Sequence, residues 1–434
     1  MKRAFLFAGW ILAGWASAQD LPPGVLLLSR VKTHAGEDLK RLTTITCFET
    51  VAREHQAAKG KMRPLDTVRL EVLTNGDREL FAAPGERKFS ENHPMSYAGS
   101  GALGNGLFGP YLKDILLSGS VASQYKGEEE AGGLRLARYE YRIPLIISGQ
   151  VIQTPEGSGK VGLHGSFWVD PNTYDVTRLE MHADEFPPTL PVTELTTSID
   201  YARTRVGNAL TPLLPETADM RLAMYSGEVN HNRIAFTHCR VFGAESSINF
   251  DAPDSAVQEP GFGVASIDET LRPLAGGLEV AVKLRSRISG DLSVGTPIEG
   301  VVAENVMAKR TVMIPAGSPV HGRIRRLERY TDPFPYFVVG LEFTEVEVEG
   351  VRHLFYADLA RMDPAAGVET TLSTKDTINT KIDPLVFGQT STRETRESLS
   401  VSNLPGVATF FYKGGRLELP RDFRTVWKTR PWKP

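Results

Sequence analysis

The 434-residue sequence has few of the patterns that mark catalytic or metal-binding proteins. It contains only two cysteines, Cys47 and Cys239, and its nine histidines are scattered along the chain. Neither H-E-x-x-H nor C-x-x-C is present, so the spacing rules for zinc sites are not met. The G-x-S-x-G motif of serine hydrolases is also missing. We therefore expect no catalytic residues, no metal site and no cofactor.

The chain also lacks a strong charge and a second long apolar run. Its formal net charge is -3, so no basic field would attract nucleic acid, and we expect no nucleic-acid partner. Beyond the N-terminus no stretch reaches the roughly 18 apolar residues of a membrane span, so no transmembrane segment is expected there. The 40 glycines and 28 prolines predict many turns and hence many short strands.

The N-terminus has the three parts of a secretory signal. Lys2 and Arg3 are followed by an apolar run, residues 4–15, and by the small-residue pattern Ala16-Ser17-Ala18. We predict a signal peptide over residues 1–18 and a periplasmic or secreted protein. An oxidising compartment permits a disulfide between Cys47 and Cys239. Two buried free thiols remain equally open, because sequence does not give the separation of the Cα atoms.

The most regular pattern lies in residues 161–184, which alternate around a turn. Phe167 and Val169 share one face of the first run, and Leu179 and Met181 share one face of the second. The turn is Asp170-Pro171-Asn172-Thr173, where proline presets φ and the Asp and Asn side chains can bond the backbone. The pattern predicts an antiparallel hairpin with one apolar face that needs a cover.

Around this hairpin, the sequence predicts two domains. Residues 19–252 are expected to form an α+β domain, with a large antiparallel sheet and helices at about 25–42 and 109–117. Residues 253–275 are the predicted linker, and 276–434 read as an all-β small barrel with a polar loop at about 367–402. The apolar C-terminus is expected to return to the barrel.

Two further stretches were candidates for ligand contacts. Gly99 to Gly104 matches the letters of G-x-G-x-x-G, but no strand precedes it and no βαβ unit surrounds it. We expect a flexible loop leading into a packing helix. The basic cluster of Arg323, Arg325, Arg326 and Arg329 is expected to be a solvated strand face, given the balanced charge.

Parts of the sequence resemble two known families. The helix near the start, Thr44-Ile45-Thr46-Cys47, residues 165–170 and residues 176–180 together resemble the LolA/LolB-like and RseB-like periplasmic domains. That resemblance implies a curved antiparallel half-barrel with helices on the concave face, which binds lipid acyl chains or senses envelope components. Residues 295–298 and 312–322 resemble the barrel of TrbI-like type IV secretion proteins, and that resemblance implies barrel geometry only.

The leading hypothesis is a non-enzymatic cell-envelope protein that binds a hydrophobic ligand, such as a lipid, or a protein segment on the curved sheet. The expected ligand-lining residues are Phe167, Val169, Leu179 and Met181. One alternative is a structural or assembly module that binds an envelope protein partner through its barrel. Another is a hydrolase with an unrecognised site. A small-ligand carrier requires a void of a few hundred Å³ against the apolar face.

Overall fold

The structure is a computed structural model, and it describes most of the chain after residue 20. The predicted signal peptide (1–18) lies outside the described residues, as do most of the predicted linker (253–275) and most of the predicted polar loop (367–402). The described residues are 21–41, 43–75, 78–86, 89, 94–98, 100–154, 157–207, 211–242, 272–332, 334–369, 372–373, 398–399 and 406–431. Within them no helix is both long enough and apolar enough to cross a bilayer.

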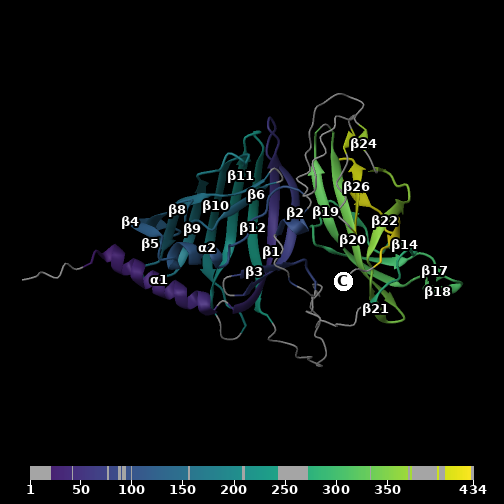
Figure 1. Ribbon diagram of the computed structural model, residues 1–434, viewed down its shortest axis with the longest axis horizontal. Coiled ribbons are helices and arrows are strands. Elements are labelled where there is room, and N and C mark those ends of the chain that lie inside the picture. The colour runs from purple at the N-terminus through teal and green to yellow at the C-terminus, as the bar shows by residue number, and fades with distance from the viewer. Residues whose placement is uncertain are drawn as a thin grey trace, which may run out of the picture.

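The first half of the chain forms one ten-stranded antiparallel sheet that curls into a half-barrel (Figure 1). Its strand order is β3-β2-β1-β12-β11-β10-β9-β8-β5-β4. The strand that comes first in the sequence, β1, therefore pairs with the one that comes last, β12. The strands are β1 (Thr43–Gln56), β2 (Arg63–Asn75), β3 (Arg78–Ala82), β4 (Ala122–Ala131), β5 (Leu134–Ile143), β8 (Gly162–Val169), β9 (Val176–Asp184), β10 (Val192–Arg203), β11 (Leu213–Met224) and β12 (Val229–Val241).

The hairpin expected from the alternation is β8–β9. Phe167 pairs with Leu179 across the two strands, and both side chains are completely buried. Burying each one contributes roughly 2–3 kcal/mol relative to leaving it in water. In the turn, the Asn172 amide donates to the Asp170 carboxylate at 2.8 Å, and Tyr174 takes a left-handed conformation with φ of 65°. The Asp170 side chain therefore bonds the backbone of the turn, as expected.

Helical segments pack against buried side chains of this sheet and share its hydrophobic core. They are α1 (Pro23–Arg41), η1 (Pro94–Tyr97), α2 (Pro110–Leu112) and the π-helical turn η2 (Lys113–Leu117). Two tyrosines of the sheet fix them: Tyr139 donates to the Gly24 carbonyl at 2.7 Å, and Tyr201 donates to the Leu107 carbonyl at 2.9 Å. Both phenols are buried, so these bonds satisfy groups that would otherwise be costly to bury.

The second half of the chain forms another ten-stranded sheet, almost free of helix. Its order is β13-β21-β20-β19-β16-β14-β28-β22, with β26 also paired to β20 and β23 paired to β26. Among the described residues the end strands β13 and β22 do not pair, so closure into a barrel is not seen there. The strands are β13 (Arg272–Pro273), β14 (Glu279–Leu284), β16 (Pro297–Val302), β19 (Pro319–Tyr330), β20 (Tyr336–Val348), β21 (Val351–Leu354), β22 (Ala357–Met362), β23 (Val368–Glu369), β26 (Val407–Lys413) and β28 (Arg424–Thr429).

The apolar C-terminus returns to this sheet, as expected. Strand β28 lies between β14 and β22, and Trp427 on it is fully buried against Phe343, with ring centroids 5.4 Å apart. Short two-stranded pairs complete the fold: β15 (Ile288–Ser289) with β27 (Glu418–Leu419), β17 (Val306–Ala308) with β18 (Thr311–Ile314), β24 (Leu372–Ser373) with β25 (Ser398–Leu399), and β6 (Val151–Thr154) with β7 (Gly157–Lys160).

The two sheets meet along β2 and β19, and one hydrophobic core runs through both. Val68 of β2 and Val294 form a bridge that is closed by two backbone bonds, Arg69 N–H to Val294 O at 2.9 Å and Val294 N–H to Thr67 O at 2.8 Å. Arg323 of β19 forms an ion pair with Glu86 at 3.3 Å.

Buried ion pairs lie in this region. Arg53 makes two bonds to Asp66, at 2.6 and 2.7 Å, and Arg326 makes two bonds to Glu328, both at 2.8 Å. The expectation of a solvated basic face is therefore wrong for Arg323 and Arg326, which are only 9% and 2% exposed. A buried guanidinium needs a carboxylate partner, and for Arg326 it is Glu328, two residues further along the same strand face, that supplies it.

Candidate functional site

A cavity of about 150 Å³ lies against the apolar face of the first sheet. Its floor is formed by residues of strands β8 to β12, and Tyr111 of α2 also lines it. Residues 101–105 and the β6–β7 hairpin cover it. The side chains that shape the floor most are Leu163, Met181, Ala183, Met220, Leu222 and Met224.

The walls of the cavity carry no charge, and most of their surface is apolar. No Asp, Glu, Lys or Arg belongs to the described lining, whose polar side chains are Asn105, Tyr111, Gln150, Thr154, Thr197 and Asn230. Three methionines contribute, and their flexible thioethers let a surface adapt to ligands of different shape. Val151, which is 50% exposed, marks the rim where the cavity reaches solvent. Such walls favour an alkyl or aromatic group over an ion.

The glycine-rich stretch forms one wall of this cavity, and it is anchored at both ends. Arg53 donates to the Ser100 carbonyl, and the side-chain amide of Asn232 donates to the Ala102 carbonyl at 2.7 Å. Gly101 has φ of +77°, and a Cβ placed there would lie 2.9 Å from the Arg53 guanidinium, so only glycine fits without strain. At the far end, the Gly106 amide donates to Glu79 at 2.5 Å. The loop is therefore more constrained than a flexible connection.

Two carboxyl groups, that of the buried Glu49 and that of the half-buried Glu79, lie near this wall. Burial, and then the charge of Glu79, raises the pKa of Glu49 to about 8. Burial also raises the pKa of Glu79, although the amides of Phe108 and Gly106 act in the opposite direction by donating to its carboxylate. Burial and the Glu79 charge raise the pKa of the Tyr111 hydroxyl, whose ring lines the cavity. Glu49 is consequently an acid that stays protonated at neutral pH.

The structure separates the four expected lining residues. Met181 lies on the cavity floor, whereas Phe167, Val169 and Leu179 are completely buried in the main core under the helical segments. The sequence analysis missed Met220, Leu222 and Met224, which alternate along β11. That alternation indicates a strand with one apolar face. It does not indicate that this strand lies close to β9 in the sheet.

Cys47 and Cys239 are joined by a disulfide, with Cα atoms 4.1 Å apart. The bond links β1 to β12, the first and last strands of the sheet, which pair directly. Of the two alternatives left open by the sequence, the structure contains the bonded form.

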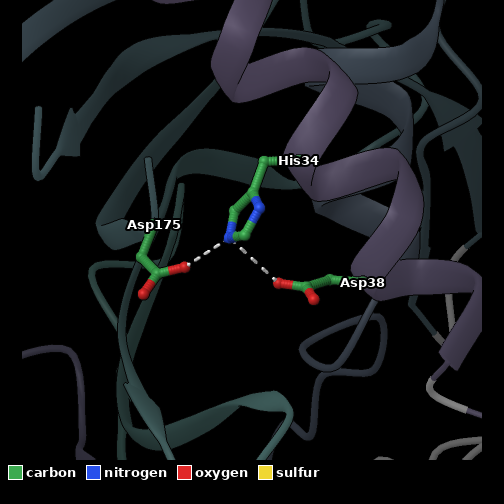
Figure 2. Close-up of side chains that lie close together, drawn as sticks. All are labelled: His34, Asp38 and Asp175. Carbon is green, nitrogen blue, oxygen red and sulfur yellow. Dashed lines mark hydrogen bonds and ion pairs between the residues drawn. The ribbon is translucent and has the colours of Figure 1, made fainter. Parts of the chain in front are cut away.

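A second cluster of polar side chains joins α1 to the β8–β9 turn. Figure 2 shows His34 of α1 between two carboxylates, with its Nε2 atom 3.0 Å from Asp175 and 3.6 Å from Asp38. Arg203 contacts the same three residues, with Nη2 2.7 Å from the His34 Nε2 atom and bonds to both carboxylates. Burial acts to raise the pKa of Asp175, but the bonds and charge of Arg203, helped by His34, outweigh it and lower that pKa.

The donor set of this cluster, one imidazole and two carboxylates, is one that metal ions accept. Arg203 already supplies the positive charge between the carboxylates, so the arrangement is an ion-pair cluster that fastens α1 to the sheet. Among the described residues, no serine hydroxyl bonds to His34, and none bonds to His164 or His231, the two other histidines paired with carboxylates.

No protein-family model and no curated protein matches the chain. Three solved structures show a partial likeness. A LolA superfamily protein from Nitrosomonas europaea has a TM-score of 0.26 and 14% identity, over 50% of this chain and 94% of its own. An outer membrane lipoprotein-sorting protein domain from Vibrio parahaemolyticus has a TM-score of 0.27 and 12% identity, over 50% and 95%. A DUF1329 family protein from Desulfovibrio piger has a TM-score of 0.25 and 12% identity, over 50% and 95%. All three TM-scores are below 0.5, so no argument about fold or function is built on them.

Proposed function

We propose that the chain is a non-enzymatic, exported cell-envelope protein that holds one narrow apolar group, such as the end of a lipid acyl chain, in the cavity of its first sheet. The observation that carries this proposal is the uncharged, methionine-rich cavity under residues 101–105. The absence of charge from the described lining favours an alkyl group over a polar substrate, and the exposed Val151 provides an entrance.

The size of the cavity limits the ligand. About 150 Å³ is the volume of an engineered apolar cavity that accommodates benzene. It is smaller than the few hundred Å³ expected for a drug-sized ligand. We therefore propose that about six carbons enter, which would contribute roughly 5 kcal/mol at about 0.8 kcal/mol per methylene. The rest of a lipid would remain outside the rim.

The proposal includes the wider organisation expected from the sequence. Residues 19–252 would form a LolA-like half-barrel domain with helices on its concave face, and 276–434 a second domain that contacts an envelope partner. The Cys47–Cys239 disulfide is compatible with a periplasmic or secreted location, because such bonds persist in oxidising compartments. A protein ligand would be limited to one inserted apolar side chain, since the same volume applies.

Native mass spectrometry of the purified mature protein, followed by titration with fatty acids of increasing length, tests the proposal. Affinity should rise with chain length up to about six inserted carbons and then level off. Ala183 is on the cavity floor, so Ala183→Phe should fill the space and weaken binding at least tenfold. His182→Phe is the matched control, since it places the same side chain on the opposite face of β9.

Equal binding by Ala183→Phe and wild type would exclude the cavity as the site. If no fatty acid binds wild-type protein but a peptide co-purifies, a protein segment replaces lipid as the ligand.

A further inference from the structure

The hairpin β17–β18 projects from the second sheet, and its exposed surface is unusually apolar. Figure 1 shows it at the end of the molecule away from the first sheet. Val306 and Ile314 are buried at its base, but Met307, Val312 and Met313 are 52%, 43% and 42% exposed. Met307 pairs with Val312 across the two strands, so these two form an exposed cross-strand apolar pair, and Met313 is a third exposed apolar side chain of the same hairpin.

The turn at the tip of this hairpin contains two cations in an unfavourable backbone conformation. Lys309 and Arg310 have φ values of 48° and 70°, the left-handed geometry of a two-residue hairpin turn. Asn-Gly is the preferred pair there, and other residues are disfavoured because their Cβ lies too close to the following carbonyl oxygen. Costly conformations of this kind concentrate at functional sites. A lysine and an arginine at both positions indicate that the side chains are needed for their charge.

The two tip cations lie apart from the carboxylates that the structure describes. Both are exposed, and within the described part of the chain no carboxylate forms an ion pair with either one. The acid nearest in sequence, Glu304, is paired with Arg424 at 2.8 Å. The hairpin therefore presents exposed apolar side chains next to two exposed positive charges.

We propose that the β17–β18 hairpin docks on an anionic lipid surface. Met307, Val312 and Met313 would enter the boundary between headgroups and acyl chains, and Lys309 and Arg310 would contact phosphates. Long cationic side chains suit that role, because their apolar stems pack on the lipid while their charges stay at the headgroups. The proposal concerns the second sheet only and does not depend on the cavity.

Vesicle flotation of the mature protein measures this docking. Vesicles of equal parts phosphatidylglycerol and phosphatidylcholine should bind the protein, and phosphatidylcholine alone should bind it much less. The variant Lys309→Asn with Arg310→Gly removes both charges and installs the preferred turn, so the hairpin itself should be stabilised. Each cation near an anionic surface is worth roughly a fivefold change in binding, so the double variant should bind about 25-fold more weakly.

Two further variants separate local docking from general attraction. Lys59→Asn with Lys61→Asn removes two exposed charges from a loop of the first sheet and should leave binding nearly unchanged. Met307→Thr with Val312→Thr removes apolar surface but keeps residues that are favoured in β-strands. This variant should bind severalfold more weakly to the same vesicles at high salt, where the charge attraction is screened. Equal losses in the hairpin and loop variants, or wild-type protein that binds neither vesicle, would overturn the proposal.

Discussion

Glu49 is a buried acid with no cationic partner among the residues that the structure describes, and replacing it by glutamine should stabilise the protein above neutral pH. Burial and the nearby Glu79 raise the pKa of Glu49 from an ordinary 4.5 to about 8. In the unfolded chain the carboxyl ionises above pH 4.5, while in the folded chain it keeps its proton until about pH 8. Folding therefore binds a proton across this interval, so the unfolding free energy must fall as pH rises from about 4.5 to about 8.

The size of the effect follows from the shift. Each pH unit in the interval changes the unfolding free energy by up to about 1.4 kcal/mol, so the total is at most roughly 5 kcal/mol. Glu49→Gln keeps the shape of the side chain and removes the charge. At about pH 8 the variant should be more stable than wild type by a few kcal/mol, and near pH 4.5 the two should be nearly equal.

Urea unfolding of the mature protein from about pH 5 to about pH 8 gives the measurement. Glu216→Gln, which changes an exposed glutamate of the same sheet, is the control and should leave the slope of stability against pH unaltered. A wild-type stability that stays flat or rises over this range, with Glu49→Gln following the same curve, would refute the reasoning.

Two more changes probe the contacts that hold the first sheet together. Replacing both Cys47 and Cys239 by serine should lower the unfolding free energy by about 2–5 kcal/mol, measured by urea unfolding, with non-reducing peptide mapping to establish the bond in wild type. Asp175→Asn should cost about 1–2 kcal/mol, because it removes a carboxylate that faces Arg203 and His34. Since the pKa of Asp175 is lowered in the folded protein, the stabilisation it gives is present above its ordinary pKa near 3.8 and is lost as pH falls below it. Thermal unfolding of the variant should therefore match wild type more closely in acid than at neutral pH.

Local patterns in the sequence were sufficient for the elements of the fold. The alternation in residues 161–184 and the turn at Asp170 predicted the β8–β9 hairpin, because both depend only on neighbouring residues. The helix α1 and the return of the apolar C-terminus were predicted for the same reason. Even the exposed and buried faces of β9 follow from its period of two.

The site could not be predicted in the same way, because it depends on which distant segments become neighbours. The cavity needs residues 101–105 to lie over Met220 and Leu222, more than a hundred positions further along the chain. The burial of Phe167 under helical segments, rather than in an open groove, likewise depends on tertiary packing. The spacing of two residues indicates that Arg326 and Glu328 lie on the same strand face, but it does not indicate that the pair is buried.

The pairing of β1 with β12 has a consequence for how the chain reaches this fold. Residues 43–56 pair early with β2, which follows them directly, but their second neighbour, residues 229–241, comes only near the middle of the chain, and the second sheet is complete only when residues 424–429 have arrived. A chain that emerges N-terminus first must keep one edge of β1 open until residue 241 has emerged, and open strand edges are prone to aggregation. The disulfide between Cys47 and Cys239 would then form only after β12 has paired with β1, when all strands of the first sheet are present.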